Sequence, residues 1–267
     1  MPLAQVADIQ LDYERSGEGP PLLMIMGRSG TYSHWGEPFL QELRRDFELI
    51  VYDHRGIGNS SRLEGPVTIR QFAQDAVGLL DTLELDSAHV LGISMGGMVA
   101  QEIALANPER VRTLTLGCTY CGGLDSALTS EEVAQRMVDA LATHDGEQII
   151  RASWESNVSA GFAADEQAWE SFRDISTRRR VALPVIVEQT RAILDHDTSG
   201  RLGEITLPTQ IVHGTADEVL PVINAHTIAG LIDGAPLQVL DGVGHLFFWE
   251  RPEHSAELLR VHAAAYA

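Results

Sequence analysis

Lysine is absent from this chain, and all nineteen basic residues among its 267 are arginines. Schiff-base and pyridoxal enzymes, Ser-Lys dyads and P-loops each need a lysine amine, so these chemistries are excluded. Acidic residues number 38, which brings the formal net charge to −19 at pH 7. Such a charge disfavours nucleic acid and anionic membranes as partners, because both bind cationic faces.

Cysteine is scarce as well, with only Cys118 and Cys121, in a C-x-x-C pattern. No second pair is present to complete a tetrahedral zinc site, and a redox pair should open a helix, whereas this one follows a predicted strand. We therefore expect two ordinary reduced thiols. The ten histidines show no H-x-x-x-H spacing, so neither a metal site nor a cofactor is expected.

Long apolar runs are also missing, since none approaches the about 20 residues that span a bilayer. The first eight residues lack a basic segment followed by an apolar one, so they do not resemble a secretory signal, and we expect a cytoplasmic location. There is no internal repeat or low-complexity tract. The length fits one large domain, or one domain with an insertion, and leaves the oligomeric state open.

Strands and helices alternate along most of the chain. Strands are predicted at 6–9, 10–15, 22–26, 49–52, 88–91 and 111–116, and again at 208–214 and 237–240. Helices are predicted at about 36–46, 68–84 and 98–106, where apolar residues recur at helical spacing. This alternation predicts a largely parallel sheet that helices cover on both faces.

The segment Gly92-Ile93-Ser94-Met95-Gly96 joins the strand at 88–91 to the helix at 98–106. A G-x-S-x-G sequence between a strand and a helix predicts a nucleophile elbow, in which a strained turn presents the serine hydroxyl above the sheet. Strand and helix pass close on both sides of such a turn, so a Cβ at either glycine would clash. The positive end of the helix favours negative charge at this point.

A serine nucleophile needs a base in contact, and the base needs a third group to hold its tautomer. Asp217 and His245 both lie just beyond predicted strands. Ligands of open α/β sheets bind at this carboxyl edge of the strands. The order Ser94, Asp217, His245 along the chain is also the order that accompanies a nucleophile elbow.

These motifs give the chain a resemblance to a known family over nearly its whole length. The matching landmarks are Tyr52–Ser60, the elbow at Gly92–Gly96, His213–Asp217, Pro221 and Gly244-His245. With them the chain resembles enzymes of the α/β-hydrolase fold, and among these the small esterases and lactonases, such as 3-oxoadipate enol-lactonase and aclacinomycin methylesterase. The resemblance implies an α/β fold whose mostly parallel eight-stranded sheet is flanked by helices. It also implies Ser94 as the nucleophile, His245 as the base and Asp217 as the acid.

The loop after the strand at 22–26 departs from the family pattern, which often begins His-Gly. Here Met26 stands at the histidine position, followed by Gly27. The loop provides a backbone N–H to the oxyanion, as any residue except proline can, so Arg28 is the candidate donor and Met95 the second. Gly27 and Ser29 are expected to line the substrate site. Loss of the histidine should alter support of the loop more than its chemistry.

The pattern changes after Gly117, since residues from about 124 to 200 show helical spacing and no convincing strand. Four helices are expected, the first capped by Thr129 or Ser130. The insertion resembles the helical cap of many family members, which predicts a core of residues 1–123 and 201–267 with a cap of 124–200. A stabilising subdomain without a role in substrate choice is the alternative. The run Arg178–Arg180 is expected to be a solvated helix face.

Five further polar residues resemble catalytic groups but are expected to have other roles. Asp53 and His54 belong to a turn after a strand, and His213 is expected to be a packed, hydrogen-bonded residue within one. Asp241 is a turn former and only a weak alternative for the acid. His34 falls on the oxyanion loop and could line the pocket, but a lone exposed histidine is the expectation.

The leading hypothesis is a cofactor-free serine hydrolase that cleaves a small-molecule carboxylic ester or lactone through an acyl-enzyme. A carbon–carbon bond hydrolase or a perhydrolase with the same triad stays open. So does a non-catalytic ligand-binding protein that kept the fold, because fold alone does not establish activity. The sequence does not name the substrate or the size of its acyl and alcohol groups.

Overall fold

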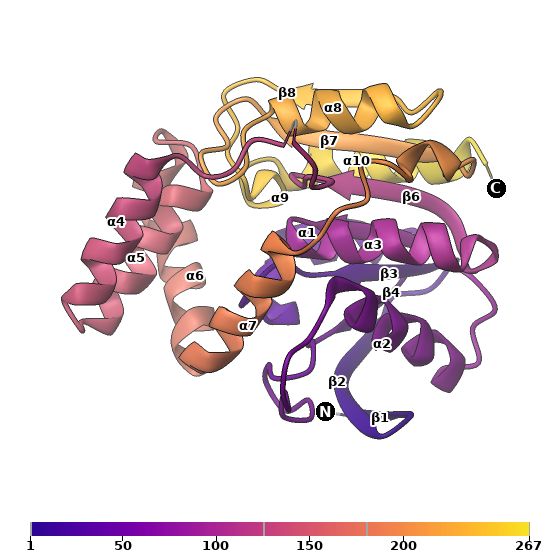
Figure 1. Ribbon diagram of the computed structural model, residues 1–267, viewed down its shortest axis with the longest axis horizontal. Helices are drawn as coiled ribbons and strands as arrows, with labels where there is room; N and C mark the ends of the chain where they lie inside the picture. Colours follow the sequence, from indigo (N-terminus) through magenta and orange to yellow (C-terminus); the bar gives the residue numbers. More distant parts are fainter. Residues whose placement is uncertain (1, 125, 180, 267) are drawn as a thin grey trace.

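An eight-stranded sheet forms the middle of the computed structural model, which describes residues 2–124, 126–179 and 181–266 (Figure 1). Its strands are β1 Leu3–Val6, β2 Ile9–Ser16, β3 Pro21–Ile25, β4 Glu48–Tyr52, β5 Ala88–Ile93, β6 Val111–Gly117, β7 Thr209–Gly214 and β8 Leu237–Leu240. They lie in the order β1-β2-β4-β3-β5-β6-β7-β8. Strand β2 pairs antiparallel with β1 and β4, and all other neighbours are parallel. The predicted fold class is confirmed.

Helices cover both faces of the sheet, and each face has its own buried apolar cluster. One face carries α2 Ile69–Thr82, α3 Met95–Ala106 and α8 Ile223–Leu231, and the other carries α1 Glu37–Leu43, α9 Phe247–Glu250 and α10 Pro252–Ala264. Strand β3 is buried at every position, as expected for a parallel strand covered on both sides. No helix in the described ranges is long and apolar enough to cross a membrane.

The N-terminal hairpin does not begin where the sequence suggested. Strand β1 ends at Val6, and Ala7 and Asp8 form the turn, with Ala7 at a φ of 49°. The prediction of a strand over 6–9 is therefore wrong, because half of that segment is the turn. The buried side chains of Ala4 and Val6 alternate with exposed neighbours and place the strand earlier.

Four α-helices lie between β6 and β7, and the described residues there contain no strand. They are α4 Glu131–Ala142, α5 Gly146–Asn157, α6 Glu166–Arg178 and α7 Leu183–Leu194, grouped at one end of the sheet (Figure 1). Ser130, one of the two expected caps, accepts a hydrogen bond from the Val133 N–H at 3.3 Å. Trp154, Trp169 and Phe172 are buried and join the apolar cluster of α1 and α9.

The arginine run after α6 does not form the uniform solvated face that the sequence suggested. Arg178 is exposed, but the guanidinium of Arg179 reaches two fully buried carboxylates of the core, and Arg180 lies outside the described residues. The prediction is wrong at Arg179. The two buried carboxylates, Asp12 and Asp53, need a positive charge close to both, and Arg179 of the insertion provides it.

The Arg179 cluster ties the insertion to the core. Its Nη1 lies 3.0 Å from Oδ2 of Asp53 and 3.2 Å from Oδ2 of Asp12, and its Nη2 donates to the Tyr32 hydroxyl at 3.3 Å. Asn59 donates to the same Asp12 oxygen at 2.7 Å. Burial raises the pKa of Asp53 to about 6, although the Tyr32 N–H and Arg179 lower it. The neighbouring Asp12 carboxylate adds a smaller contribution to this rise.

Candidate active site

Ser94 lies at the end of β5, directly before Met95, the first residue of α3. Its φ of 53° and ψ of −123° are strained for a residue with a side chain, at a cost of about 1–3 kcal/mol. Two hydrogen bonds hold the turn: the Ser94 N–H donates to the Gly117 carbonyl at 3.0 Å, and Thr119 Oγ1 donates to the Ser94 carbonyl at 2.7 Å. The geometry is that of the predicted elbow.

Close backbone contacts surround the elbow. A Cβ on Gly96 would lie 2.0 Å from the Ile25 carbonyl oxygen, and one on Gly92 would lie 2.2 Å from the Gly96 carbonyl oxygen. The clash expected at both glycines is confirmed. On the other side, a Cβ on Gly27 would lie 3.1 Å from Cβ of Ser94. The loop that begins at Gly27 therefore lies directly against the serine.

Asp217 and His245 follow β7 and β8 and meet at the same edge of the sheet. Both are buried, and His245 Nδ1 lies 2.7 Å from Asp217 Oδ2. Asp217 Oδ1 accepts the Val219 and Leu220 N–H groups, each at 2.8 Å. Because a carboxylate only accepts, the assignment puts the proton on Nδ1 and leaves Nε2 as the available ring nitrogen. Asp241, the weaker candidate, is exposed.

His213 is a second histidine on the same carboxylate. It is fully buried, with Nε2 2.9 Å from Asp217 Oδ2 and 2.8 Å from the Leu220 carbonyl, so its predicted packed role is confirmed. Its approach to Asp217 was not predicted. Burial alone would raise the pKa of Asp217, but His245 and His213 together bring it down to about 2. The carboxylate is therefore ionised at neutral pH.

The loop at 27–30 and the start of α3 supply two backbone donors. Within the described chain, no acceptor is hydrogen-bonded to the N–H of Arg28 or of Met95. The N–H of Ser29 donates instead to Gln189 Oε1 at 2.8 Å, and the Arg28 side chain donates from Nη1 to Thr190 Oγ1 at 2.9 Å. Gln189 and Thr190 belong to α7, so the insertion contacts this loop directly.

His54 supports the strand end where the family histidine is missing. Its Nε2 lies 3.0 Å from the Met26 carbonyl, and its ring packs edge-on against Tyr52 and Phe72. Burial lowers the pKa of His54 to about 4, so the ring is neutral at pH 7. The expected structural role of His54 agrees with this packing.

Glu250 in α9 is a supporting residue that sequence reasoning missed. Its Oε1 accepts the N–H groups of Gly244 at 2.8 Å and Ser159 at 2.7 Å, and its Oε2 accepts the Ser159 hydroxyl at 2.6 Å. One carboxylate thereby joins the loop of His245 to the segment after α5. Nothing in the sequence separates it from an ordinary surface glutamate.

His34 is not the lone exposed histidine that was expected. Its Nε2 lies 3.1 Å from Ser176 Oγ of α6, and its ring centroid is 5.5 Å from that of Phe172. Trp249 Nε1 donates to the His34 carbonyl at 2.7 Å. Burial lowers the pKa of His34 to about 4. The prediction is wrong because the insertion covers this residue, a contact that no local pattern reveals.

The C-x-x-C pair lies in the protein interior, close to the elbow. Cys118 and Cys121 are both buried thiols, and the Cys118 N–H donates to the Val212 carbonyl at 2.9 Å. Burial raises the pKa of the Cys118 thiol well above its ordinary value. A thiol in that state is a poor nucleophile.

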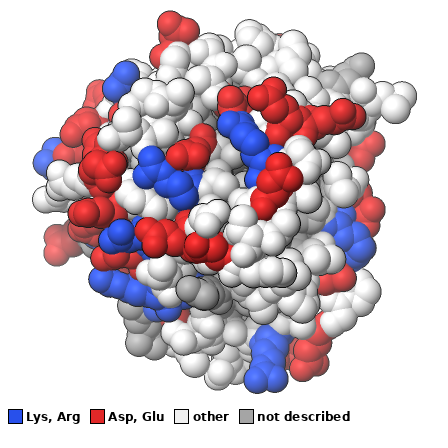
Figure 2. Space-filling view, turned by 90° about the vertical axis from the view of Figure 1, so that its left-hand side faces the viewer, with Lys and Arg blue, Asp and Glu red and all other residues white. Residues whose placement is uncertain are grey.

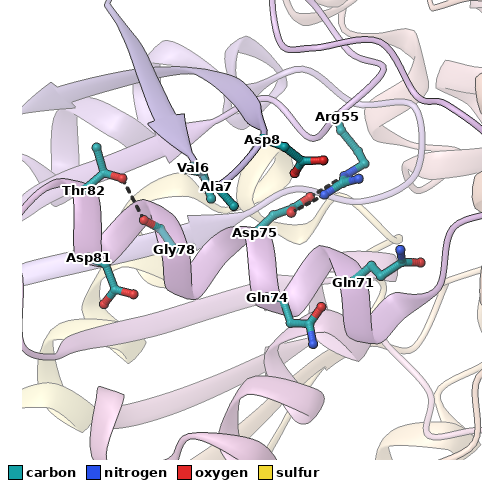
Figure 3. Close-up of a pocket in the computed structure, with 10 residues that line it drawn as sticks. All are labelled: Val6, Ala7, Asp8, Arg55, Gln71, Gln74, Asp75, Gly78, Asp81 and Thr82. Carbon is teal, nitrogen blue, oxygen red and sulfur yellow. Dashed lines mark hydrogen bonds and ion pairs between the residues drawn. The ribbon is translucent and has the colours of Figure 1, made fainter.

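A hollow of ≈ 480 Å³ lies apart from these groups, between the β1–β2 hairpin and α2 (Figure 3). Arg55 is engaged there by two hydrogen bonds to Asp75, at 2.7 and 2.5 Å, with Asp8 nearby and Asp81 at the other end of the hollow. None of the predicted site residues lines it. In the described ranges, no group of three or more His, Cys, Asp or Glu side chains is arranged to hold a metal ion.

Comparison with known proteins agrees with this geometry. The family model of the alpha/beta hydrolase fold matches residues 20–252. The chain is 29% identical over 268 residues to the putative carbamate hydrolase RutD of Azorhizobium caulinodans, with 97% of each covered. It is 27% identical over 285 residues to the rhodomycin D methylesterase DnrP of Streptomyces peucetius, with 92% of each covered. The solved enol-lactonase from Burkholderia xenovorans LB400 matches with a TM-score of 0.84 at 25% identity, over 98% of this chain and 100% of that one. The chain belongs to the α/β-hydrolase fold family of enzymes.

Proposed function

We propose that this chain is a cofactor-free serine hydrolase that cleaves a carboxylic ester or lactone through an acyl-enzyme. The observation that carries the proposal is the 2.7 Å contact between His245 Nδ1 and Asp217 Oδ2, on the same sheet edge as the strained Ser94. A carboxylate bound to Nδ1 leaves Nε2 free to accept a proton from a hydroxyl. This arrangement suits acyl transfer from a carbonyl substrate.

In the proposed reaction, Ser94 Oγ attacks the substrate carbonyl carbon while His245 Nε2 takes the hydroxyl proton. Asp217 stabilises the imidazolium, and the N–H groups of Arg28 and Met95 bind the oxyanion. His245 then gives the proton to the leaving alcohol as the carbon–oxygen bond breaks. Water, deprotonated by His245, attacks the acyl carbon, so the acid leaves and the serine hydroxyl is restored.

We further propose that residues 124–200 act as a cap over a core of residues 1–123 and 201–267. Gln189 and Thr190 of α7 contact the loop that supplies the first oxyanion donor, and Ser159 contacts Glu250 beside the loop of His245. The insertion therefore contacts the core on both the oxyanion-loop side and the His245-loop side of Ser94. Substrate choice is expected to depend on the cap, because remote parts of a substrate meet it first.

A substrate panel tests the proposal. It contains carboxylic esters and lactones of graded acyl length, together with carbamates, since one relative is named a putative carbamate hydrolase. We expect hydrolysis of at least one ester or lactone and a loss of about 10³-fold or more in kcat for Ser94→Ala, with an unchanged unfolding midpoint. Ser171→Ala, an exposed serine of α6, is the matched control and should keep full activity.

Two outcomes would overturn this proposal. Near wild-type hydrolysis by Ser94→Ala would remove the serine from the mechanism. Binding of the panel compounds without any turnover would favour the non-catalytic alternative.

A further inference from the structure

Arg28 stands apart from most arginines of this acidic chain. Most of those in the described part of the chain have an acidic oxygen within 4.0 Å, such as Arg136 beside Glu218 and Arg151 beside Glu155. Figure 2, which looks onto the side of the insertion, shows arginines interspersed with acidic side chains. Figure 3 shows the same pairing for the arginine of the hairpin hollow. Arg28 has no such acidic neighbour among the described residues.

The Arg28 side chain is nevertheless held in one place. Its Nη1 donates to Thr190 Oγ1 at 2.9 Å, and that hydroxyl in turn donates to the Ile186 carbonyl at 2.7 Å. The partner of the guanidinium is thus neutral, and its positive charge is left unbalanced. The side chain is exposed to solvent, yet enough protein surrounds it that burial lowers the pKa of the guanidinium.

An orphan donor lies beside Arg28. Gln189 is fully buried, and its Oε1 accepts the Ser29 N–H at 2.8 Å, which settles the orientation of the amide. Its Nε2 has no hydrogen-bond partner among the described residues. A buried donor without a partner costs about 1–3 kcal/mol, so such groups are rare unless they serve a ligand. Gln189 precedes Thr190 on α7, so both groups lie at the same contact between helix and loop.

We propose that the Arg28 guanidinium and the Gln189 Nε2 amide bind a carboxylate on the substrate, so that the substrate is an ester or lactone that also carries a free carboxylate. The inference rests on the proposed function, because it concerns the substrate of the same site. A guanidinium offers planar, paired N–H donors that match a carboxylate, and the amide adds a further donor. A Cβ on Gly27, the residue before Arg28, would lie 3.1 Å from Cβ of Ser94, so the loop that carries Arg28 lies against the nucleophile.

The experiment compares matched substrates. Mono-p-nitrophenyl esters of linear dicarboxylic acids carry a free carboxylate, and their ω-methyl esters have the same chain without the charge. The measured quantity is the ratio of kcat/KM for the acid to kcat/KM for its methyl ester, at each chain length. A ratio within one variant cancels any general effect of a substitution on the reacting centre.

At the preferred chain length, we expect Arg28→Gln to lower this ratio by about tenfold or more, the effect of one charged hydrogen bond. Gln189→Glu keeps an acceptor for the Ser29 N–H but places a carboxylate beside Arg28, so it should lower the ratio as well. Arg112→Gln is the control, because Arg112 is another exposed arginine without an acidic neighbour in the described chain, at the opposite end of the sheet. It should leave the ratio unchanged.

If turnover is too slow to measure, the binding of the acid and of its methyl ester can be compared directly. Calorimetry on Ser94→Ala should show tighter binding of the acid than of its methyl ester, and addition of Arg28→Gln should remove the difference. If the ratio and the affinity difference are the same with and without Arg28 at every chain length, the carboxylate site is refuted while ester hydrolysis stands. If the wild-type chain hydrolyses neither compound but Ser94→Ala binds the acid selectively, the carboxylate site stands and the proposed reaction fails.

Discussion

Replacement of Asp217 by asparagine changes both histidine contacts at Oδ2 and leaves the two backbone contacts at Oδ1 in place. The asparagine oxygen can still accept the N–H groups of Val219 and Leu220, which lie 2.8 Å from Oδ1 of the aspartate. The new amide nitrogen then faces His245 Nδ1 and His213 Nε2, which lie 2.7 and 2.9 Å from Oδ2. Because that nitrogen donates, His245 Nδ1 must accept. The ring proton therefore moves to Nε2.

A histidine protonated at Nε2 cannot take the proton of the serine hydroxyl. In serine proteases with the same arrangement this change costs about 10⁴-fold in kcat. At 1.36 kcal/mol for each tenfold change in rate, the loss corresponds to about 5 kcal/mol of transition-state stabilisation. We expect a loss of this order here, with little change in KM, because the Asp217 side chain is fully buried.

Asp217→Asn should also lower stability in a pH-dependent way. The pKa of Asp217 is about 2 in the folded chain, against 3.8 as the model value for aspartate. A depressed pKa contributes stability that is complete above about pH 4 and is lost as the pH falls toward 2, and the shift amounts to about 2 kcal/mol. The unfolding free energies of the variant and the wild type should therefore differ at pH 7 and converge in acid.

Steady-state hydrolysis of the best ester and denaturant unfolding at two pH values measure both effects. Asp241→Asn is the matched control, because Asp241 is exposed and hydrogen-bonds only at the surface, to Thr215. Activity of Asp217→Asn within tenfold of the wild type would refute the reasoning. A larger loss from Asp241→Asn than from Asp217→Asn would move the acid to the other loop.

Three further perturbations test the supporting structure. Gly27→Ala places a Cβ 3.1 Å from Cβ of Ser94, so it should displace the oxyanion loop and lower kcat by about 10²-fold in the ester assay. Gly161→Ala is the control, because its Cβ meets nothing within 4 Å, and it should leave kcat unchanged. Arg179→Gln leaves two buried carboxylates without a cation and should lower the unfolding free energy by about 3 kcal/mol or more, whereas Arg178→Gln should change it by less than about 0.5 kcal/mol in denaturant titrations. Asp53 has a pKa raised by burial to about 6, so the folded state holds a proton that the unfolded state releases, and stability is lost as the pH rises from about 4 to 6. Thermal unfolding of Asp53→Asn should lack this loss, and identical pH profiles for variant and wild type would contradict it.

The elbow and the helix cap were predicted well because each depends on a few consecutive residues. The meeting of Asp217 and His245 was predicted from the topology of parallel sheets. Gly92 and Gly96 flank the serine within five residues, and the Ser130 cap lies directly before its helix. Asp217 and His245 are far apart in sequence, but each follows a parallel strand, and the carboxyl ends of such strands share one edge. Their meeting follows from topology alone.

The features that the sequence did not predict depend on contacts between distant elements. Arg179 meets a carboxylate 126 residues earlier, Gln189 meets an amide 160 residues earlier, and Glu250 meets a turn 91 residues earlier. Each lies in a helix or directly after one, where periodicity marks the apolar face and does not distinguish one polar residue from another. Only the packing of the insertion on the core distinguishes them.

Covalent labelling tests the central claim, that Ser94 is an activated nucleophile, most directly. The wild-type chain is treated with a small fluorophosphonate, and the mass of the intact protein and of its peptides locates the adduct. We expect a single adduct, on the peptide that contains Ser94, and none in Ser94→Ala. Ester hydrolysis without an adduct on Ser94, or an adduct that persists in Ser94→Ala, would contradict the account.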